Sequence, residues 1–167
     1  ATIAQATTAE DATNSGTVTV GTISDTAAAI AASTNAVIAN SAGAVTASTA
    51  ATVAQATTID AFAKAVVFAV SDTAAAIAAS SSDALDEATS VTASTTATQA
   101  QADTIAAFGT AVVYNVSGTA AEIVAASAGA RNEAVNITIT GDATIAQATT
   151  AEDATNSGTV TVGTISD

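Results

Sequence analysis

Five amino acids are absent from this 167-residue chain: proline, cysteine, methionine, tryptophan and histidine. Without cysteine the chain can form no disulfide bond and carry out no thiol chemistry. The joint absence of histidine and cysteine also excludes Ser-His-Asp and Cys-His catalytic arrangements. Transition metals lose their usual protein ligands for the same reason.

Aromatic and basic residues are almost as scarce. The chain has four aromatic residues and only two basic ones, Lys64 and Arg131, against 15 acidic residues, for a net charge of −13. Binding to nucleic acid requires clustered lysine and arginine, so we expect no nucleic-acid partner. Paired carboxylates such as Glu10 and Asp11 occur in glycosidases, but a sugar cleft normally needs aromatic platforms. We therefore expect no enzyme.

Long hydrophobic runs are missing as well, although 49% of the residues are apolar. No run approaches the roughly 18–20 residues of a membrane span, so we expect no membrane insertion. The chain instead contains 49 alanines and 32 threonines, nearly half of its length. Alanine buries little area but lets backbones approach closely, which favours thin stacked layers over one thick core.

The most informative feature of the sequence is an exact repetition. Residues 1–25 return without change as residues 143–167, which gives a period of 142 residues. Two unrelated stretches of a domain do not agree at 25 successive positions. We expect the chain to be a window on a longer tandem array, in which this periodicity predicts a solenoid or a polymer.

A shorter and less regular period lies inside the long one. The segment Ser24-Asp25-Thr26-Ala-Ala-Ala-Ile-Ala-Ala recurs 47 residues later and again, more loosely, 46 residues after that. A second marker keeps nearly the same step: Gln5, Gln55, Gln101 and Gln147. Three units of about 47 residues therefore make up one long period.

Each unit is predicted to contain a strand, a helix, a second strand and a second helix. In the clearest unit, residues 66–70 are β-branched or aromatic and predict a buried strand. The Ala-rich segment 73–85 predicts a helix that places Ile77 in the core, as Ile30 and Ile123 would be in the other units. Residues 90–94 predict the second strand and residues 97–108 the second helix. The other units follow the same plan, with strands at 17–23, 44–48, 112–116 and 136–140 and helices at 26–39, 51–65, 119–130 and 143–154.

Strands joined by helices must run parallel, with right-handed crossovers. The expected fold is therefore α/β: a parallel-sheet α/β solenoid of about 47-residue strand–helix–strand–helix repeats. The alternative is an all-β solenoid, because runs such as Thr17–Val20 are also strand-like. The expected divisions are 1–17 (end of a preceding repeat), 18–65, 66–111 and 112–159 (three repeats) and 160–167 (start of the next).

The layout DTAAAIAAS, then AL, SVTAS and AQADTIAAF, resembles the repeats of very large bacterial surface and adhesin-like proteins. The resemblance extends over nearly the whole chain. It implies an extracellular structural role and no activity. Such proteins are commonly exported and often carry calcium-binding modules elsewhere in their chains.

Few residues are candidates for a site. Calcium needs only oxygen ligands, and possible ones are Asp25, Asp72, Asp83, Asp86 and Glu87. For Asp25 and Asp72, the capping of helix N-termini is a sufficient explanation. Asn115 and Asn136 match the N-glycosylation pattern but lie in predicted strands. Arg131 occupies the position of Ile38 and Leu85 in the other units. We expect either that the helix ends early at this position and leaves Arg131 solvated, or that Arg131 pairs with a carboxylate on a neighbouring coil.

The expected function is structural: a tandem-repeat component of an extracellular bacterial filament, sheath or surface layer, whose partners are copies of itself. The alternative is a binding module, either the stalk of an adhesin or an ice-binding repeat. Ice binding would use rows such as Thr17/Thr19 and Thr138/Thr140, which recur irregularly along the sequence.

Overall fold

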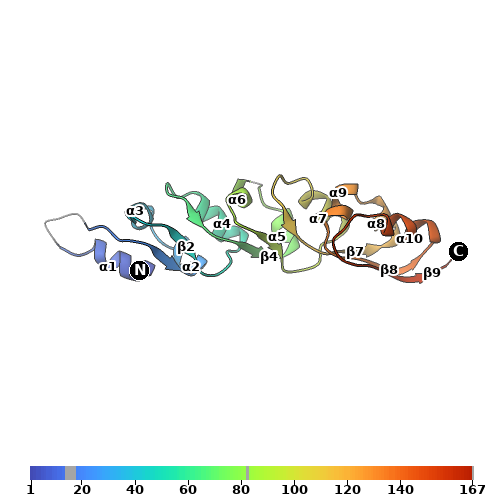
Figure 1. Cartoon of the computed structure of the whole chain (residues 1–167), viewed down its shortest axis with the longest axis horizontal. Coiled ribbons are helices and arrows are strands. Elements are labelled where there is room, and N and C mark those ends of the chain that lie inside the picture. Colours follow the sequence, from blue (N-terminus) through green and yellow to red (C-terminus); the bar gives the residue numbers. More distant parts are fainter. Residues whose placement is uncertain (14–17, 82, 167) are drawn as a thin grey trace. The chain divides into compact units, whose positions relative to one another are not determined.

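A computed structural model describes residues 1–13, 18–81 and 83–166 (Figure 1). The chain forms two compact units. Unit 1 contains Ala1–Ser71 together with Asp83–Ser90, and unit 2 contains Asp72–Ser82 together with Val91–Asp167.

Unit 1 alternates short helices and short strands. Its elements are α1 (Ile3–Glu10), β1 (Ile23–Asp25), α2 (Ala27–Ala31), α3 (Asn35–Ala39), β2 (Val45–Ala47), α4 (Val53–Asp60), β3 (Val66–Val67) and α6 (Asp83–Asp86). Strand β4 (Val70–Asp72) lies where the two units meet in sequence.

Unit 2 continues the same alternation with longer strands toward its end. Its elements are α5 (Ala74–Ala78), β5 (Val91–Ala93), α7 (Gln99–Ile105), β6 (Val112–Val113), β7 (Val116–Thr119), α8 (Ala120–Ala125), α9 (Ala128–Glu133), β8 (Ile137–Ala143), α10 (Ile145–Glu152) and β9 (Val160–Ile165).

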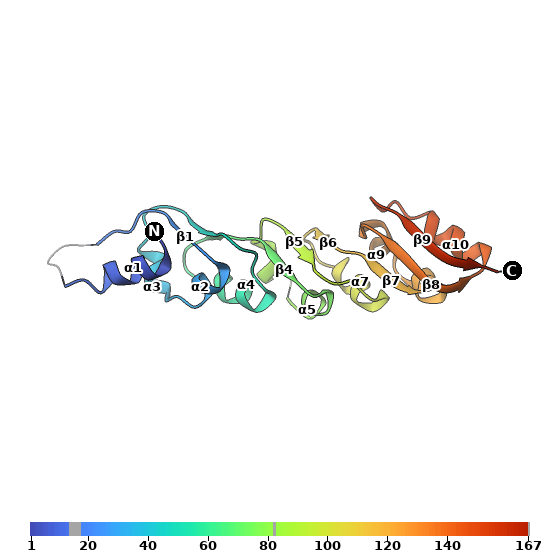
Figure 2. The same ribbon diagram turned by 90° about the horizontal axis from the view of Figure 1, so that it is seen from below.

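The strands form three small parallel sheets, ordered β1-β2-β3, β4-β5-β6 and β7-β8-β9. In the third sheet β8 lies between β7 and β9 (Figure 2). Register partners in the first sheet run from Ile23 to Val45 and on to Val66, steps of 22 and 21 residues. The expected α/β class, with parallel strands recurring at about half of the 47-residue repeat, is confirmed.

Equivalent residues of successive repeats form the core. Ile30, Ile77 and Ile123 have no exposed surface, as the repeat alignment predicted. In the strands, Ile23, Val45 and Val66 point inward in one row. Burial of such side chains contributes roughly 1.5–3 kcal/mol each. The apolar positions that recur in the sequence repeat are therefore buried core positions.

A threonine N-cap precedes the longer helices, which explains the second repeat marker, the recurring glutamine. Thr2, Thr52, Thr98 and Thr144 are N-caps, and each accepts a hydrogen bond from the backbone of the glutamine three residues later. The glutamine side chain in turn accepts the N–H of the threonine, which completes a capping box. The four marker glutamines are the second halves of these boxes.

The helices predicted at 26–39, 73–85 and 119–130 are each interrupted, which corrects the expectation of one helix per segment. Residues 73–85 form α5 and α6, and residue 82 lies outside the described part of the chain. The Ser80 hydroxyl donates to the Ile77 carbonyl at 2.7 Å, and Ser33 does the same to Ile30. These serines satisfy the carbonyls that the next helical turn would use, so α5 and α2 end there.

The strand predicted at 66–70 is also divided. Val66 and Val67 pair with β2, whereas Val70 begins β4 of the second sheet. Between them the Phe68 carbonyl accepts the backbone N–H of Thr89 at 2.8 Å and its hydroxyl at 2.9 Å. The Phe68 ring is buried, so the predicted inward position of this residue is correct although the strand is not continuous.

The two identical 25-residue segments fold alike in their helices. Helices α1 and α10 begin and end at corresponding residues and carry the same capping box. The Ser24 N–H donates to the Ala1 carbonyl at 2.9 Å, and the Ser166 N–H donates to the Ala143 carbonyl at the same distance. They differ in the strand: β9 starts at Val160, whereas β1 starts only at Ile23.

Candidate functional site

The outward side of each sheet carries small polar or β-branched side chains. These residues alternate with buried neighbours, and in the three sheets they are Ser24, Thr46 and Val67; Thr92 and Val113; and Ser117, Thr138 and Thr161. Val67 is 48% exposed and Val113, its equivalent 46 residues on, is 51% exposed. Each sheet therefore presents a short row of outward side chains without charge.

Only some of the threonines considered for ice binding lie on this outward surface. Thr138 belongs to the outward row, and Thr140 is exposed and pairs with Thr119. Thr19 is exposed, whereas residue 17 lies outside the described residues. The recurring feature is an outward side chain on each of these strands, with both Thr138 and Thr140 on β8, and a search of the sequence for threonine pairs misses it because it ignores valine.

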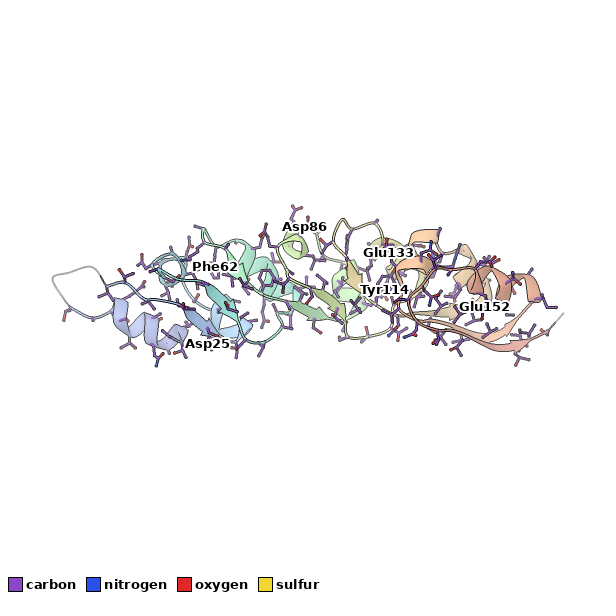
Figure 3. All side chains as sticks on the ribbon, viewed as in Figure 1. Asp25, Phe62, Asp86, Tyr114, Glu133 and Glu152 are labelled. Carbon is purple, nitrogen blue, oxygen red and sulfur yellow. The ribbon has the colours of Figure 1, made fainter. Side chains whose placement is uncertain are left out.

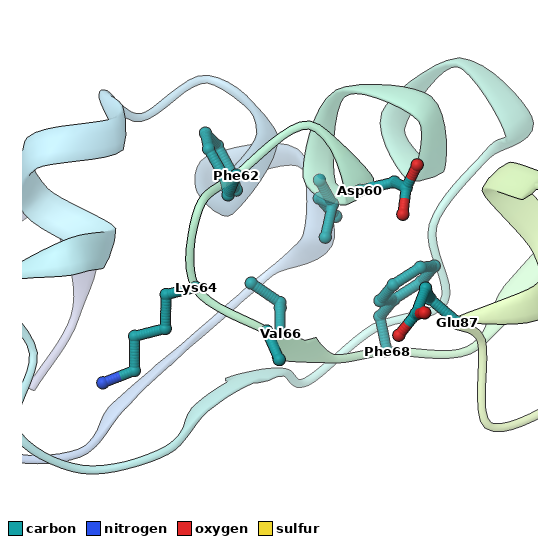
Figure 4. A pocket seen from close by; sticks show the side chains of 8 residues that line it. Asp60, Phe62, Lys64, Val66, Phe68 and Glu87 are labelled. Atoms are coloured by element: carbon teal, nitrogen blue, oxygen red, sulfur yellow. The ribbon is translucent and has the colours of Figure 1, made fainter.

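A hollow of about 230 Å³ lies in unit 1, with Phe62 and Phe68 against Val66 and with Asp60 and Glu87 at its edge (Figure 4). Lys64 also lines it, but its ammonium group donates to the Ser41 carbonyl and is directed away from the two carboxylates (Figure 4).

Unit 2 has the equivalent hollow, lined by Phe108, Val112 and Glu133 among others. These residues lie 46 positions after Phe62, Val66 and Glu87. The lysine is not repeated, because threonine occupies position 110. Sequence reasoning did not identify this pair of hollows, although the shared spacing of phenylalanine and glutamate was a visible signal. The second hollow thus keeps the phenylalanine and the glutamate of the first but not its lysine.

The first two candidate calcium ligands cap backbone amides. One Asp25 carboxylate oxygen accepts the Thr26 N–H at 2.8 Å, and the other accepts the Ile3 N–H at 3.0 Å. Asp72 accepts the Thr73 N–H at 2.8 Å. Each aspartate thus fixes the turn from a strand into the helix that follows.

The other three candidates lie on α6 or beside it. Asp83 and Asp86 belong to its single turn, Asp86 projects away from the ribbon (Figure 3), and Glu87 lines the hollow of unit 1. Within residues 1–13, 18–81 and 83–166, no three acidic side chains are grouped so that they could hold a metal ion. Calcium binding by these residues stays a prediction.

Arg131 does not follow the first expected alternative, in which the helix ends early and leaves it solvated. Helix α9 continues to Glu133, and Arg131 is half-buried. Its guanidinium group donates to the carbonyls of Ile123 at 3.3 Å, Val124 at 3.1 Å and also Ala126. A cation at the C-terminal end of α8 interacts favourably with the helix dipole and with the carbonyls of the last turn. Arg131 therefore ties α9 to the end of α8.

Asp103 of α7 performs the matching task at the start of α9. It accepts the Ser127 N–H at 2.7 Å and a hydrogen bond from Gln99. Burial favours the neutral acid, but the hydrogen bonds from Ser127 and Gln99 and the charge of Arg131 together lower the pKa of Asp103 below its usual value. The carboxylate is charged and structural.

The only tyrosine of the chain is a core residue of unit 2. Tyr114 is 1% exposed, and its hydroxyl donates to the Ala130 carbonyl at 2.9 Å. Burial, reinforced by the charges of Glu133 and Asp103, raises the pKa of this hydroxyl far above its ordinary value. A phenol held neutral in this way is unsuited to acid–base catalysis near neutral pH.

The two asparagines of the glycosylation pattern are joined across neighbouring coils. The Asn136 side chain donates to the Asn115 side-chain oxygen at 2.8 Å, and the Asn136 backbone N–H reaches the same oxygen at 3.1 Å. The Asn136 side-chain oxygen then accepts the Thr159 N–H at 3.0 Å. This ladder of polar side chains runs beside β7, β8 and β9 and holds their register.

None of the helices in the described residues is long and apolar enough to cross a membrane. No protein-family model, curated protein or solved structure matches this chain. The repeated packing positions and the outward rows are therefore the basis for any functional conclusion.

Proposed function

We propose that this chain is a structural protein: a tandem-repeat component of an extracellular bacterial filament, sheath or surface layer, assembled from copies of itself. The observation that carries the proposal is the repetition of one local design. Capped helices at Thr2, Thr52, Thr98 and Thr144 and buried isoleucines at 30, 77 and 123 recur with the period of the sequence. Repetition of the same local structure supports a protein in which further repeats extend one surface.

The same proposal includes the architecture. The coils stack in one continuous α/β solenoid of about 47-residue repeats, in which each coil covers the core of the next. The parallel registers within the sheets support this arrangement, since partners lie 21 residues apart from Val91 to Val112 and from Val116 to Ile137.

The location and the absence of catalysis rest on composition and on the resemblance described above. An acidic chain with one lysine and one arginine offers few cleavage sites to trypsin-like proteases. Its carboxylates, exposed at Asp83 and Asp86 among others, repel neighbouring copies unless cations screen them. Calcium is the proposed cation, and it would act between copies.

Electron microscopy and sedimentation velocity of the purified 167-residue chain, with and without calcium, test the proposal. We expect filaments or ordered arrays of constant width at high protein concentration, with closer lateral packing in calcium. A stable monomer at every protein and calcium concentration would exclude a role in assembly. The hydrolase activities considered for the carboxylate pairs should be absent from the same preparation.

The outward rows favour one second candidate, an ice-binding repeat. The rows of Thr46 beside Val67 and of Thr92 beside Val113 place methyl groups and hydroxyls on neighbouring parallel strands, at the strand spacing of about 4.8 Å. A thermal-hysteresis assay separates the two functions, because a filament component without ice affinity leaves the freezing point equal to the melting point. An adhesin stalk would also lack hysteresis and would stay monomeric.

A further inference from the structure

The two hollows lie at equivalent positions of the repeat, one in each unit. We call the hollow of about 230 Å³ in unit 1 hollow 1, and the one of about 350 Å³ in unit 2 hollow 2. They share lining residues that are identical and 46 positions apart: Phe62 and Phe108, Val66 and Val112, and Glu87 and Glu133. The other aromatic residues, Phe68 and Tyr114, are also 46 positions apart. A chain with only four aromatic residues thus places all of them in the two repeat segments that form the hollows.

Hollow 1 has an apolar floor and an acidic rim. Asp60 and Glu87 are exposed, and Phe62 is half-buried. In Figure 4 the carboxylates of Asp60 and Glu87 lie on the same side as the Phe68 ring, whereas the ammonium group of Lys64 lies on the opposite side. The floor consists of buried side chains: Ile59, Val66 and Phe68. Apolar surface and carboxylates therefore line the same cavity.

Hollow 2 repeats this arrangement with one carboxylate fewer. Val112 is buried, Phe108 is half-buried and Glu133 is exposed. The charge of Glu133 contributes to the raised pKa of Tyr114, which places its carboxylate beside the aromatic side chains of unit 2. Ala106 occupies the position equivalent to Asp60.

The rim carboxylates are not used by other groups in the part of the chain that the structure describes. Neither Asp60 nor Glu87 forms a hydrogen bond or an ion pair with another described residue. Lys64 lines hollow 1, but its ammonium group donates to the Ser41 carbonyl instead. The carboxylates can therefore accept an external cation.

An apolar floor below a carboxylate fits a ligand that is apolar at one end and cationic at the other. The carbon chain would leave water against the floor while the charged group stays at the wet rim. A cation beside a phenylalanine ring also gains a cation–π interaction. An anion would be repelled by a chain of net charge −13. Among the described residues no three acidic side chains are grouped to hold a metal ion, so an organic cation fits better than calcium.

We propose that each hollow binds an alkylammonium ion, whose carbon chain lies over the apolar floor and whose ammonium group pairs with Glu87 in hollow 1 and with Glu133 in hollow 2. Hollow 1 has a second carboxylate, Asp60, at its rim. It therefore prefers a diamine, whereas hollow 2 treats amines and diamines alike. This binding activity goes beyond the proposed structural function and does not depend on it.

Phenylalanine NMR measures binding to each hollow separately, because the chain has only three phenylalanines. Ring-labelled full chain, at concentrations below assembly, gives signals from both hollows, which Phe62→Leu and Phe108→Leu assign. We expect n-butylammonium to shift the signals of both hollows with a dissociation constant on the order of 1 mM. The uncharged n-butanol, with the same carbon chain, should bind about fivefold more weakly or less.

Single substitutions test the carboxylates, and the unchanged hollow is the internal control. Glu87→Gln should weaken n-butylammonium binding about fivefold in hollow 1 only, and Glu133→Gln should do so in hollow 2 only. Both glutamates are exposed, so the fold should persist, which circular dichroism checks. Asp83→Asn is the matched control, because it removes an exposed charge of unit 1 that does not line the hollow, and it should change binding by less than about twofold.

Straight-chain diamines test the second carboxylate of hollow 1. The best of them should bind hollow 1 about fivefold more tightly than n-butylammonium, but hollow 2 no more than about twofold, the statistical factor for two equal ends. Asp60→Ala gives hollow 1 the residue that hollow 2 has at position 106 and should remove this preference.

Losses confined to the substituted hollow, together with the loss of diamine preference in Asp60→Ala, support the inference. If n-butanol binds as well as n-butylammonium, or if Asp83→Asn weakens binding as much as Glu87→Gln, the hollows do not recognise the ammonium group and the inference is wrong. It is also wrong if the amines leave the phenylalanine signals unchanged or if calcium chloride alone shifts them. None of these outcomes changes the sedimentation and microscopy results that decide the structural function.

Discussion

Gly163→Ala and Gly21→Ala place the same methyl group in the same 25-residue sequence, with opposite expected effects. A Cβ atom at Gly163 would lie 2.7 Å from the Gly141 carbonyl oxygen, whereas nothing lies within 4 Å of the corresponding position at Gly21. Cβ atoms essentially never approach other atoms below 3.0 Å, so the backbone of unit 2 must shift. Gly141 has little room to yield, because it lies at φ +81° where the register of β8 and β9 changes.

The magnitude follows from two opposing contributions. Overpacking of this kind costs about 1–3 kcal/mol, and replacing glycine by alanine returns about 0.4–1 kcal/mol by restricting the unfolded chain. Gly163→Ala should therefore destabilise unit 2 by about 1–2 kcal/mol. Gly21→Ala should leave the stability of unit 1 unchanged or raise it by up to about 1 kcal/mol. Intrinsic residue preferences cancel between the two variants.

Urea unfolding at protein concentrations below assembly measures both effects. Tyr114 is the single tyrosine and the chain has no tryptophan, so tyrosine fluorescence reports on unit 2, while circular dichroism follows both units. We expect a lower midpoint by fluorescence for Gly163→Ala and no loss for Gly21→Ala. Equal effects of the two substitutions would refute the close packing of β9 on β8 at Gly163.

Three further predictions concern caps and titration. Thr98→Ala removes one capping box and should cost about 1 kcal/mol in urea unfolding, while Thr98→Ser should retain most of the stability. In an absorbance titration, Tyr114 should resist ionisation well above the ordinary tyrosine pKa of 10.0. Because folding raises the pKa of this hydroxyl, its contribution to stability is constant below pH 10.0 and falls above it. A normal titration of the folded protein would contradict the buried hydroxyl. Because folding lowers the pKa of Asp103, the contribution of this carboxylate to stability is present above about pH 4 and is lost as the pH falls. Asp103→Asn should therefore flatten this part of the acid unfolding curve. An unchanged curve would contradict the capping role of Asp103.

Much of the core could be predicted from the sequence because the repeat compares each position with its equivalents. Ile30, Ile77 and Ile123 keep their place in every unit, and all three are buried. The parallel strands followed from the alternation of β-branched runs with Ala-rich segments. A threonine followed three residues later by glutamine was also visible, but it was used only as a marker of the period and not as a cap.

The breaks within elements could not be predicted from propensity or pattern. Alanine favours helix before Ser33 and Ser80, and the end of the helix depends on whether the serine hydroxyl turns back to a carbonyl. The role of Arg131 was equally hidden, because its partners are backbone carbonyls of α8 and leave no signal in side-chain identity.

Of the candidate site residues, Asp25 and Asp72 each accept the N–H of the threonine that follows, and it is this threonine, Thr26 or Thr73, whose side chain caps the next helix. The outward rows were missed for a different reason. Valine is a typical core residue, so the sequence alone suggests that Val67 and Val113 are buried. Only the register of β3 and β6 shows that they point outward.

Diffraction from aligned assemblies of the full chain tests the central claim, that stacked repeat coils build a structural filament. Stacked parallel strands predict a reflection along the filament axis at about 4.8 Å, and six coils per 142-residue period predict an axial repeat of about 29 Å. Assemblies that show both spacings along the axis agree with a continuous α/β solenoid. Ordered assemblies with no axial spacing near 4.8 Å would contradict it.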